Sequence, residues 1–537
     1  MAFTTASVLR SSALEKAEVI AAQFHYSDDE LRTCVGKFRS QLGLYTPSLD
    51  KQFHIALNHH ADEGLRERTP AMCQIPTYVT CVAKGTEKVN GLALGVDLGG
   101  TNLRVCLVEL HGDSSYHAVH SKVSLPSKIM LACEAAELFG FIADQIEMLL
   151  RNHCPDQLSV SDNIATLSLG LTFSFPVYQN AINSGILLRW TKGFDIPSVV
   201  GQDVCELLQR EIALRGLPVK VTALVNDAAG TIMARAYSLP LGETRTSIGA
   251  IFGTGTNGVY LENLSEIRKP LDGHFDGSSG KMFVSIEWGS FDNELSVLPN
   301  TEYDIEINDF SRNPGNQMFE KRVSGMFLGE LLRTILARLH NDPAVRLFAG
   351  LDANSGRKTG DQIPLFTRWT VDSSILSVAG LDETDDLAML RQKIFDVLGV
   401  PSPATKIEDA QIVKIIAHAI GKRAARLGGM ALGAVVAKTE QLGSVGSLRQ
   451  DECSPGLGGE DDSTKLRLAN QQPCVVDVGV DGSVIEFYPR FEAYMREALR
   501  AVDGIGTAGE EMIRIGLAKD GSSVGAAIIA LVAAQQA

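Results

Sequence analysis

The chain has 537 residues, of which 45% are hydrophobic and 21% charged, and its formal net charge is −15. This composition is typical of a soluble globular protein with a large core, and the length predicts about three or four domain-sized units. The acidic balance disfavours a general nucleic-acid binder, which needs clustered lysine and arginine to neutralise phosphates. A small phosphorylated ligand stays compatible with it, because a few local cations can outweigh the global charge.

The cysteines and the first residues of the chain indicate the cellular compartment in which the protein resides. Nine cysteines lie between Cys34 and Cys474 without a C-x-x-C pair, which is typical of reduced thiols in a cytosolic protein and provides no zinc framework. Residues 1–19 are rich in serine and threonine but lack the apolar core of a secretory signal. A mitochondrial transit peptide is one interpretation of these residues, and an ordinary N-terminal arm is the favoured one. No run of about 18 apolar residues occurs, so no membrane span is predicted.

The predicted elements begin with a helix over 14–42, where apolar residues recur at helical spacing. Residues 44–72 form a polar loop or insertion, and we interpret the pair His59 and His60 as part of that loop rather than as a metal site. A strand-rich segment follows over 77–123. Further helices are predicted at about 131–152, 201–215, 322–340 and 405–439, and residues 442–473 have the composition of a disordered surface loop.

Residues 91–105, GLALGVDLGGTNLRV, combine an apolar strand, a Gly-Gly-Thr-Asn turn and a second strand. The glycines let backbone N–H groups approach a ligand and form a nest for phosphate. Asp97 at the turn could hold a magnesium ion directly or through water, and Arg104 could neutralise phosphoryl charge. A plain hairpin with a glycine turn is the alternative, and this motif alone does not decide between them.

A similar unit occurs later, in TSIGAIFGTGTNGVYLEN over 246–263. Two strand–glycine turn–strand units predict a duplicated α/β architecture whose two lobes face one cleft. The segment GTGTNG also fits the dinucleotide fingerprint of a dehydrogenase, but that fingerprint must open a helix, and a strand-like run follows here. A second phosphate-binding hairpin is therefore the better interpretation.

Asp227 follows the buried run VTALV, where its carboxylate would project from a strand end toward a substrate hydroxyl as a general base. The alternative is a cap on the following helix, and before other motifs are considered the cap is favoured. Asn257, Glu287, Gln317 and Glu320 could bind a ring of sugar hydroxyls. Taken singly, such groups are more often surface residues or acids at a helix start.

Two further stretches carry candidate groups. In LTFSFP the hydroxyl of Ser174 is held in a turn before a proline, and Thr191 and Lys192 offer a hydroxyl and an ammonium group on a loop. The lysine could stabilise charge that develops on an alkoxide or phosphoryl group. Near the C-terminus, AKDGSSVGAA opens an apolar helix that Ser522 or Ser523 could cap, and such a helix start suits phosphate or ribose.

Taken together, these stretches resemble the hexokinase family, and most its fungal glucokinase members. The matching pieces follow the family's order from about residue 75 to 530, which makes coincidence implausible. They are LGVDLGGTNLRV, LGLTFSFP, LLRWTKGFDIP, ALVNDAAGT, IFGTGTNGVY, SIEWGSFDNELSVLP, NPGNQMFEKRVSGMFLGEL, GVDGSVIEFYP and AKDGSSVGAA.

The resemblance implies an α/β, two-lobed fold of the actin/hexokinase ATPase type, with a cleft between a small and a large domain. Residues 1–73 would form an N-terminal helical arm and insertion, 74–225 the small domain and 226–537 the large domain, with a return of the C-terminal helix to the small domain left open. The implied activity is transfer of the γ-phosphoryl group of Mg-ATP to the 6-hydroxyl of glucose or another hexose. This reaction is the first step of glycolysis, and a cytoplasmic location goes with it.

The resemblance also assigns roles to residues. Asp227 would be the catalytic base, Lys192 and Arg104 the catalytic cations, and Asp97 the residue that holds Mg2+ through water. The sugar would be held by Ser174, Phe175, Thr191, Lys192, Asn226, Asp227, Asn257, Glu287, Gln317 and Glu320. The nucleotide would be faced by Asp97, Gly99, Gly100, Thr101, Asn102, Arg104, Lys122, Gly253, Thr254, Gly521 and Ser522.

Three positions depart from the family pattern. Ala228 stands where threonine is usual, Ser285 where asparagine is usual, and Ser523 where glycine is usual in the adenosine turn. A side chain at Ser523 is expected to crowd the nucleotide. These departures motivate a rival interpretation, a catalytically weak or inactive glucose sensor with the same fold.

A second rival is a glycosidase that uses two of Asp227, Glu287 and Glu320 as a carboxylate pair. It leaves both glycine turns unexplained. The sequence predicts no nucleic-acid partner, and it does not discriminate glucose from fructose or mannose, because all three present similar hydroxyls.

Overall fold

The computed structural model describes residues 12–43, 72–80, 89–100, 102–158, 166–190, 193–239, 246–273, 275–351, 363–439, 442 and 475–536. The predicted site residues Thr101, Thr191 and Lys192 lie outside these ranges, as do His59, His60 and, apart from Leu442, the loop expected over 442–473. Within the described ranges, no helix is long and apolar enough to cross a membrane.

A five-stranded sheet has the order β4-β3-β2-β5-β8. Strands β2, β5 and β8 are parallel, and β3 and β4 continue the sheet as antiparallel strands. The central strands are parallel and covered on both faces, which is why β5 reads as an uninterrupted buried run. The bounds are β2 (Asn90–Leu98), β3 (Asn102–His111), β4 (Tyr116–Ser124), β5 (Leu167–Phe173) and β8 (Val219–Val225).

Helices cover both faces of this sheet. Apolar side chains of α5 and α6 pack on one face, and those of α18 and α7 pack on the other. A small hairpin of β6 and β7 lies between β5 and α6 in the chain. The bounds are α4 (Ser127–Met130), α5 (Ala135–His153), β6 (Val177–Ala181), β7 (Ser184–Leu187), α6 (Val204–Leu214), α7 (Asp227–Tyr237) and α18 (Gly521–Gln536).

A six-stranded sheet has the order β1-β11-β10-β9-β12-β13. Strands β9 and β10 form an antiparallel pair across the second glycine bend, as β2 and β3 do across the first, and β12 runs parallel to β9 as β5 does to β2. The predicted repetition of the strand–bend–strand unit is therefore confirmed. The bounds are β1 (Ile75–Pro76), β9 (Thr246–Phe252), β10 (Thr256–Asn263), β11 (Lys281–Ser285), β12 (Val476–Asp481) and β13 (Ile513–Leu517).

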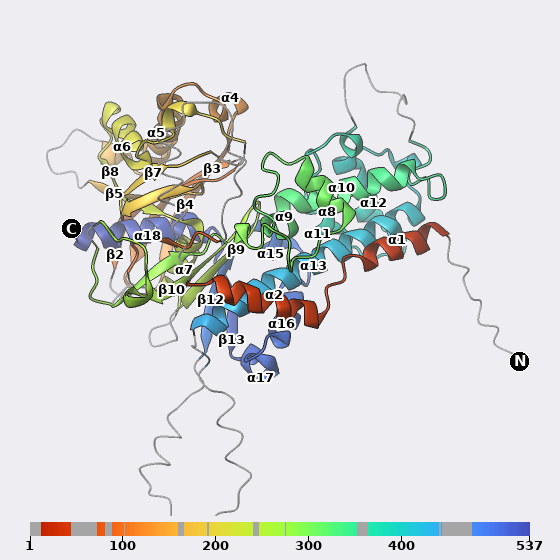
Figure 1. Cartoon of the computed structure of the whole chain (residues 1–537). Helices are drawn as coiled ribbons and strands as arrows, with labels where there is room; N and C mark the ends of the chain where they lie inside the picture. Colours follow the sequence, from red (N-terminus) through yellow and green to blue (C-terminus); the bar gives the residue numbers. More distant parts are fainter. Residues whose placement is uncertain are drawn as a thin grey trace, which may run out of the picture.

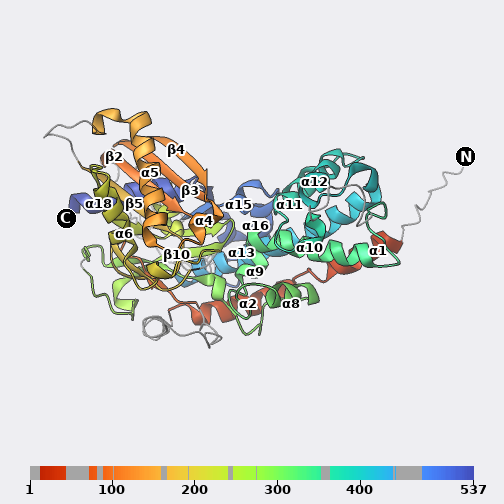
Figure 2. The same ribbon diagram turned by 90° about the horizontal axis from the view of Figure 1, so that it is seen from above.

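The remaining helices pack around the long helix α13, which α1, α2, α10, α11 and α16 all contact. Figure 1 shows this helical region at one end of the molecule, the five-stranded sheet at the other, and the six-stranded sheet between them; Figure 2 gives the view from above. The bounds are α1 (Ser12–Ala22), α2 (Asp28–Gln41), α8 (Glu302–Asp309), α9 (Glu320–Val323), α10 (Gly325–Asn341), α11 (Ser374–Leu381), α12 (Ala388–Leu398), α13 (Ile407–Thr439), α15 (Ser483–Phe487), α16 (Phe491–Ala501) and α17 (Gly506–Glu511).

The single helix predicted over 14–42 is wrong, because the chain forms two helices there. Helix α1 ends at Ala22, and α2 begins at Asp28 with Ser27 as its N-cap. The Ser27 side chain accepts from the Glu30 backbone N–H, and the Glu30 side chain accepts from that of Ser27. This capping box satisfies amide groups that a helix start leaves without partners, so it favours a new helix at this point.

Helix α18 approaches the five-stranded sheet with its own backbone. A Cβ on Gly95 of β2 would lie 2.0 Å from the Ser523 carbonyl oxygen, and one on Gly170 of β5 would lie 2.1 Å from that of Ala526. On the other side of the helix, a Cβ on Gly525 would lie 1.8 Å from the Gly230 carbonyl oxygen of α7. Glycines at these contacts bring the N-terminus of α18 to the carboxyl ends of β2 and β5.

Candidate active site

The first glycine bend holds a buried carboxylate, Asp97. Asp97 and Arg104 are directly opposite each other in the β2–β3 pair, and Arg104 Nη1 lies 3.2 Å from Asp97 Oδ2. The Ser522 hydroxyl, at the start of α18, donates to the same oxygen at 2.9 Å. The bend itself is closed by Gly99 N–H, which donates to the Asn102 carbonyl at 3.1 Å. The structure thus brings the predicted residues Asp97, Arg104 and Ser522 together.

Two aspartates that the sequence analysis did not select surround this pair. Arg104 Nε lies 4.0 Å from Asp520, which has a left-handed backbone with φ of 54°. Burial, together with the negative charges of Asp97 and Asp520, raises the pKa of Asp481 to about 7. The charge of Arg104 lowers that pKa by a smaller amount. Arg104 is thus paired with two carboxylates and influences a third, and we call Asp97, Asp481 and Asp520 the acidic cluster.

The sequence contains a signal for Asp481 that was missed. Residues 479–483, GVDGS, repeat the pattern of residues 95–99, GVDLG, and each aspartate is at or next to the end of a buried strand. Asp481 ends β12, whereas Asp97 precedes the last residue of β2. The internal repetition of the fold, rather than any local propensity, would have pointed to this residue.

The second glycine bend borders the same cluster. A Cβ on Gly482, next to Asp481, would lie 2.5 Å from the Phe252 carbonyl oxygen and 2.7 Å from the Gly253 nitrogen. The bend is tied to the start of α10, because the carbonyls of Gly253 and Thr254 accept from the first two N–H groups of that helix. Both bends thus lie near Asp481.

Asp227 begins α7 directly after β8. Asn226 is the N-cap of this helix, with Oδ1 accepting from Ala228 N–H at 3.0 Å. The cap favoured for Asp227 on local grounds is therefore made by its neighbour. Asp227 Oδ1 also accepts from Ala228 N–H, at 2.8 Å, and Oδ2 accepts from the Ser174 hydroxyl at 3.3 Å. The positive end of the helix dipole favours the ionised carboxylate here.

The base candidate lies at the same sheet edge as the acidic cluster. Asp97 is opposite Thr172 in the β2–β5 pair, and Thr172 is opposite Val225 in the β5–β8 pair. Asp97 and Val225 are therefore two strands apart, about 10 Å. Asp227 follows Val225 by two residues, so it lies at the same end of the sheet as the first glycine bend.

Four predicted sugar ligands from three chain segments also converge. Asn257 Nδ2 donates to Glu287 Oε1 at 2.7 Å, and Glu320 Oε2 accepts from Thr256 N–H at 3.1 Å. A Cβ on Gly289 would lie 2.2 Å from Gln317 Oε1 and 3.3 Å from the Glu320 Cβ. We call Asn257, Glu287, Gln317 and Glu320 the polar quartet.

Two members of the polar quartet have a strained backbone. Glu287 has φ of 58° and Gln317 has φ of 56°, in the left-handed region that non-glycine residues seldom adopt. Each such residue costs on the order of 1–3 kcal/mol, and strain of this kind clusters at functional sites. The side chain of Asn257 holds the Glu287 backbone in place, because Asn257 Oδ1 accepts from the Glu287 N–H at 3.0 Å.

Other predicted residues have structural partners that the sequence did not show. The Phe175 ring is buried in an aromatic cluster with Phe173, Trp190 and Phe194, so it supports the turn that carries Ser174. Lys122 is exposed on β4, directly opposite Arg104 of β3. Gly521 is buried, and a Cβ on it would lie 3.2 Å from the Cα of a residue in α7.

The roles expected for the two serines at the start of α18 need correction. Neither caps the helix, because the Ser522 hydroxyl donates to Asp97 and the Ser523 hydroxyl donates to the Asp520 carbonyl at 3.2 Å. Ser523 is fully buried. Its side chain is therefore turned into the protein and does not crowd a nucleotide at the surface.

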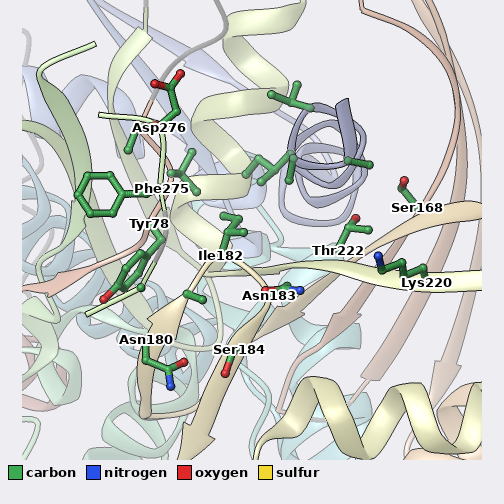
Figure 3. Close-up of a pocket in the computed structure, with 18 of the residues that line it drawn as sticks. Tyr78, Ser168, Asn180, Ile182, Asn183, Ser184, Lys220, Thr222, Phe275 and Asp276 are labelled. Carbon is green, nitrogen blue, oxygen red and sulfur yellow. The ribbon is translucent and has the colours of Figure 1, made fainter. Parts of the chain in front are cut away.

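A cavity of about 890 Å3 lies elsewhere, and none of the predicted site residues lines it. Figure 3 shows Ser168, Thr222 and Lys220 on one side of it, and Tyr78 and Phe275 on the other. Ser168 is near the start of β5, whereas Ser174 follows the end of that strand, roughly 20 Å away at the rise of a β-strand. The cavity is thus at the amino ends of the parallel strands, and the candidate active site is at their carboxyl ends.

Comparisons with known proteins identify the family of this chain. Two family models, both described as hexokinase, match residues 16–237 and 247–532. The chain therefore belongs to the hexokinase family.

Individual relatives align over nearly its whole length. The chain is 44% identical over 541 residues to the glucokinase of Aspergillus niger, covering 98% of this chain and 99% of that protein. It is 37% identical over 539 residues to Glucokinase-1 of Saccharomyces cerevisiae, covering 97% of each. The solved structure of Schistosoma mansoni hexokinase complexed with glucose has a TM-score of 0.74 at 29% identity, and the match covers 97% of this chain and 99% of that one. The predicted two-lobed hexokinase-type fold is confirmed.

Proposed function

We propose that this chain is an ATP-dependent glucose kinase, which transfers the γ-phosphoryl group of ATP to the sugar 6-hydroxyl and releases glucose 6-phosphate. The main observation behind the proposal is that these groups lie close together at the carboxyl edge of the five-stranded sheet. Two glycine bends border the acidic cluster, and Asp227 lies about two strands from it. The glucokinase names of the relatives support the choice of sugar and reaction.

In this proposal Asp227 takes the proton of the 6-hydroxyl as the new O–P bond forms. Its Oδ2 accepts from Ser174, and the start of α7 favours its ionised form, so the base is oriented and charged before substrate binds. Asn226 begins the same helix and is proposed to contact the sugar. Positioning and electrostatics supply most of the rate in phosphoryl transfer, since the reaction needs no covalent intermediate with the protein.

The polar quartet is proposed to hold the remaining sugar hydroxyls. Amide and carboxylate groups that converge from three segments offer both donors and acceptors, which a ring of hydroxyls requires. Ser174, Thr191 and Lys192 are proposed to close the sugar site from the other lobe. Phe175 acts in this scheme by holding the Ser174 turn. Closure of the two lobes would exclude water, which otherwise competes with the sugar as phosphoryl acceptor.

The glycine bends are proposed to bind the triphosphate through their backbone N–H groups, with Arg104 as the cation beside the transferred group. Lys192 is the second proposed cation. Lys122 lies opposite Arg104 and is proposed to contact the nucleotide from β4. The other groups assigned to the nucleotide are Gly99, Gly100, Thr101, Asn102, Gly253, Thr254, Gly521 and Ser522.

The acidic cluster fits a magnesium ion that accompanies ATP. In the described residues, no three histidine, cysteine, aspartate or glutamate side chains converge closely enough to hold a metal by themselves. Magnesium usually keeps several waters and binds one or two carboxylates plus substrate phosphates, so a dedicated cage is not required. We propose that Asp97 holds the ion through water, where it would neutralise charge on the phosphates.

A sugar sensor without catalysis is the second candidate, motivated by Ala228, Ser285 and Ser523. The buried position of Ser523 removes the crowding argument for it. Ala228 is also fully buried, and the side chain of the neighbouring Asp227 keeps its contact with Ser174. The carboxylate proposed as the general base is thus present, which favours the kinase over the sensor.

A steady-state screen tests the proposal. Purified protein is assayed with glucose, fructose and mannose against ATP, with and without Mg2+, by a coupled assay for hexose 6-phosphate. ATP-dependent glucose 6-phosphate is the expected product. Glucose binding in calorimetry without any product would favour the sensor, and sugar release from a glycoside without ATP would favour the glycosidase.

We also propose that the enzyme acts in the cytoplasm and supplies glycolysis. The reaction product supports this place, and so do the free thiols among the described cysteines, which suit a reducing compartment. Fractionation of the source cells, with activity and protein followed in cytosolic and mitochondrial pools, is the test.

A further inference from the structure

Ser285 occupies a fixed position beside the polar quartet. It is the last residue of β11, it is 2% exposed, and it is paired on one side with Val259 of β10 and on the other with Ile75 of β1. The next residue is held in the same way, because Ile286 N–H donates to the Gly258 carbonyl and its own carbonyl accepts from Gln74 N–H. The backbone beneath the Ser285 hydroxyl is therefore rigid.

The hydroxyl of Ser285 connects two members of the quartet. Its Oγ accepts from Asn257 Nδ2 at 3.0 Å and donates to Glu287 Oε1 at 2.9 Å. Asn257 Nδ2 donates to the same Oε1 at 2.7 Å, so three side chains form a closed triangle. A hydroxyl is both donor and acceptor, and alanine can make neither contact.

The triangle fixes one oxygen of the Glu287 carboxylate and leaves the other available. Both side-chain hydrogen bonds of Glu287 within the described part of the chain go to Oε1. A carboxylate oxygen can accept two hydrogen bonds, so Oε2 retains capacity for ligand hydroxyls. Glu287 is partly exposed whereas Ser285 is buried, so the ligand would meet the glutamate and not the serine.

We propose that Ser285 is a positioning residue, which pre-orients Glu287 and Asn257 for sugar and thereby sets the affinity for glucose rather than the rate of phosphoryl transfer. The inference rests on the proposed function, because it assigns Glu287 and Asn257 to the sugar. It deepens that function at a position where the chain departs from its family's usual asparagine. A pre-oriented carboxylate loses less side-chain freedom when ligand binds, so its contribution falls mainly in ground-state binding.

The test compares Ser285→Ala with Ser285→Thr. Loss of one ordered side chain corresponds to about a 3- to 10-fold weaker affinity, so Ser285→Ala is expected to raise KM for glucose by that factor, with kcat and KM for ATP within about twofold of wild type. Threonine keeps the hydroxyl on a β-branched side chain suited to a strand, and it is expected to restore the wild-type KM. Calorimetric titration with glucose alone is expected to show the same ratio as KM.

Ser290→Ala is the matched control. Ser290 is 3% exposed, lies five positions further on, and makes no side-chain hydrogen bond to Asn257 or Glu287 in the described structure. It is expected to leave KM for glucose unchanged. If Ser290→Ala raises that KM as much as Ser285→Ala does, or if Ser285→Ala lowers kcat and both KM values change together, the role is general packing and the proposal fails.

A double-mutant cycle with Glu287→Gln tests the route of the effect. If Ser285 acts through the glutamate, Ser285→Ala changes KM for glucose by a smaller factor in the Glu287→Gln background than in wild type. An equal factor in both backgrounds overturns the proposal. Failure of the proposed function looks different, because wild-type protein would then form no ATP-dependent product, whether or not it binds glucose.

Discussion

The Ser174 hydroxyl donates to Asp227 Oδ2 across 3.3 Å and thereby joins the end of β5 to the start of α7. Local sequence gives these residues separate explanations, a turn before a proline and an acid at a helix start. Their contact gives Asp227 a fixed orientation at the carboxyl edge of the sheet, beside the acidic cluster. Asn226 is the N-cap of α7, and the Asp227 carboxylate that follows it is proposed to face the substrate.

Asp227→Ala is expected to reduce kcat by at least about 100-fold, because a positioned general base contributes on the order of 10²–10⁴ in rate. Glucose binding should persist, since the polar quartet is unchanged. The coupled assay measures kcat and calorimetry measures binding. Asp113→Ala is the control, because Asp113 is exposed in the β3–β4 turn and bonds only to Ser115 within the described residues. Near-normal turnover in Asp227→Ala would remove this residue from catalysis.

Asp481 is expected to make stability depend on pH. Its pKa in the folded protein is raised from 3.8 to about 7, so between these values the folded state binds more protons than the unfolded state. The free energy of unfolding therefore decreases as pH rises from about 4 to 7, by an amount on the order of 4 kcal/mol when the shift is complete. Below the unfolded-state pKa this loss is absent.

The variant Asp481→Asn cannot titrate and keeps an oxygen that can accept from the Gly482 N–H. Thermal unfolding without nucleotide or Mg2+ is measured for both proteins from pH 5 to 8.5. The variant is expected to gain Tm relative to wild type, with a larger gain at pH 8.5 than at pH 5. A difference that stays constant over this range would show that Asp481 does not titrate there.

Gly289→Ala is expected to disturb the sugar site directly. The added Cβ would lie 2.2 Å from Gln317 Oε1, so that side chain must move, and a misplaced ligand group costs on the order of tenfold or more. KM for glucose should rise by at least about 10-fold, while KM for ATP changes little. Gly277→Ala is the control, because among the described residues its Cβ would meet only Leu264 and Phe275, both at 3.7 Å. Equal changes in the two KM values would contradict a local effect.

Gly525→Ala is expected to lower the free energy of unfolding by about 3 kcal/mol or more. Its Cβ would lie 1.8 Å from the backbone carbonyl oxygen of Gly230, which cannot rotate away as a side chain can. Gly36→Ala is the opposite case. Gly36 is exposed in the middle of α2, and no atom of the described residues lies within 4 Å of the added Cβ, so alanine should stabilise the protein by about 0.5–1 kcal/mol. Urea unfolding measures the free energy of unfolding of both variants, which is expected to fall for Gly525→Ala and to rise for Gly36→Ala. A neutral Gly525→Ala would show that α18 can move off α7.

Local pattern was sufficient for several elements. The helix predicted over 405–439 corresponds to α13, and the strands predicted around the two glycine turns correspond to β2, β3, β9 and β10. The break between α1 and α2 was missed, although the capping box of Ser27 and Glu30 is itself a local signal. That error came from weighting apolar spacing above helix-start chemistry.

The sequence by itself determined the two strand–bend–strand units, their chemistry-bearing residues and the family to which the chain belongs. Only the tertiary structure decided that Ser522 bonds to Asp97, 425 positions away, that Asp481 lies near both bends, and that Ser285 links Asn257 to Glu287. The physical reason is the separation along the chain of the residues that interact. Periodicity, glycine turns and helix caps depend on neighbours along the chain, whereas these contacts depend on how two sheets and a C-terminal helix pack against each other.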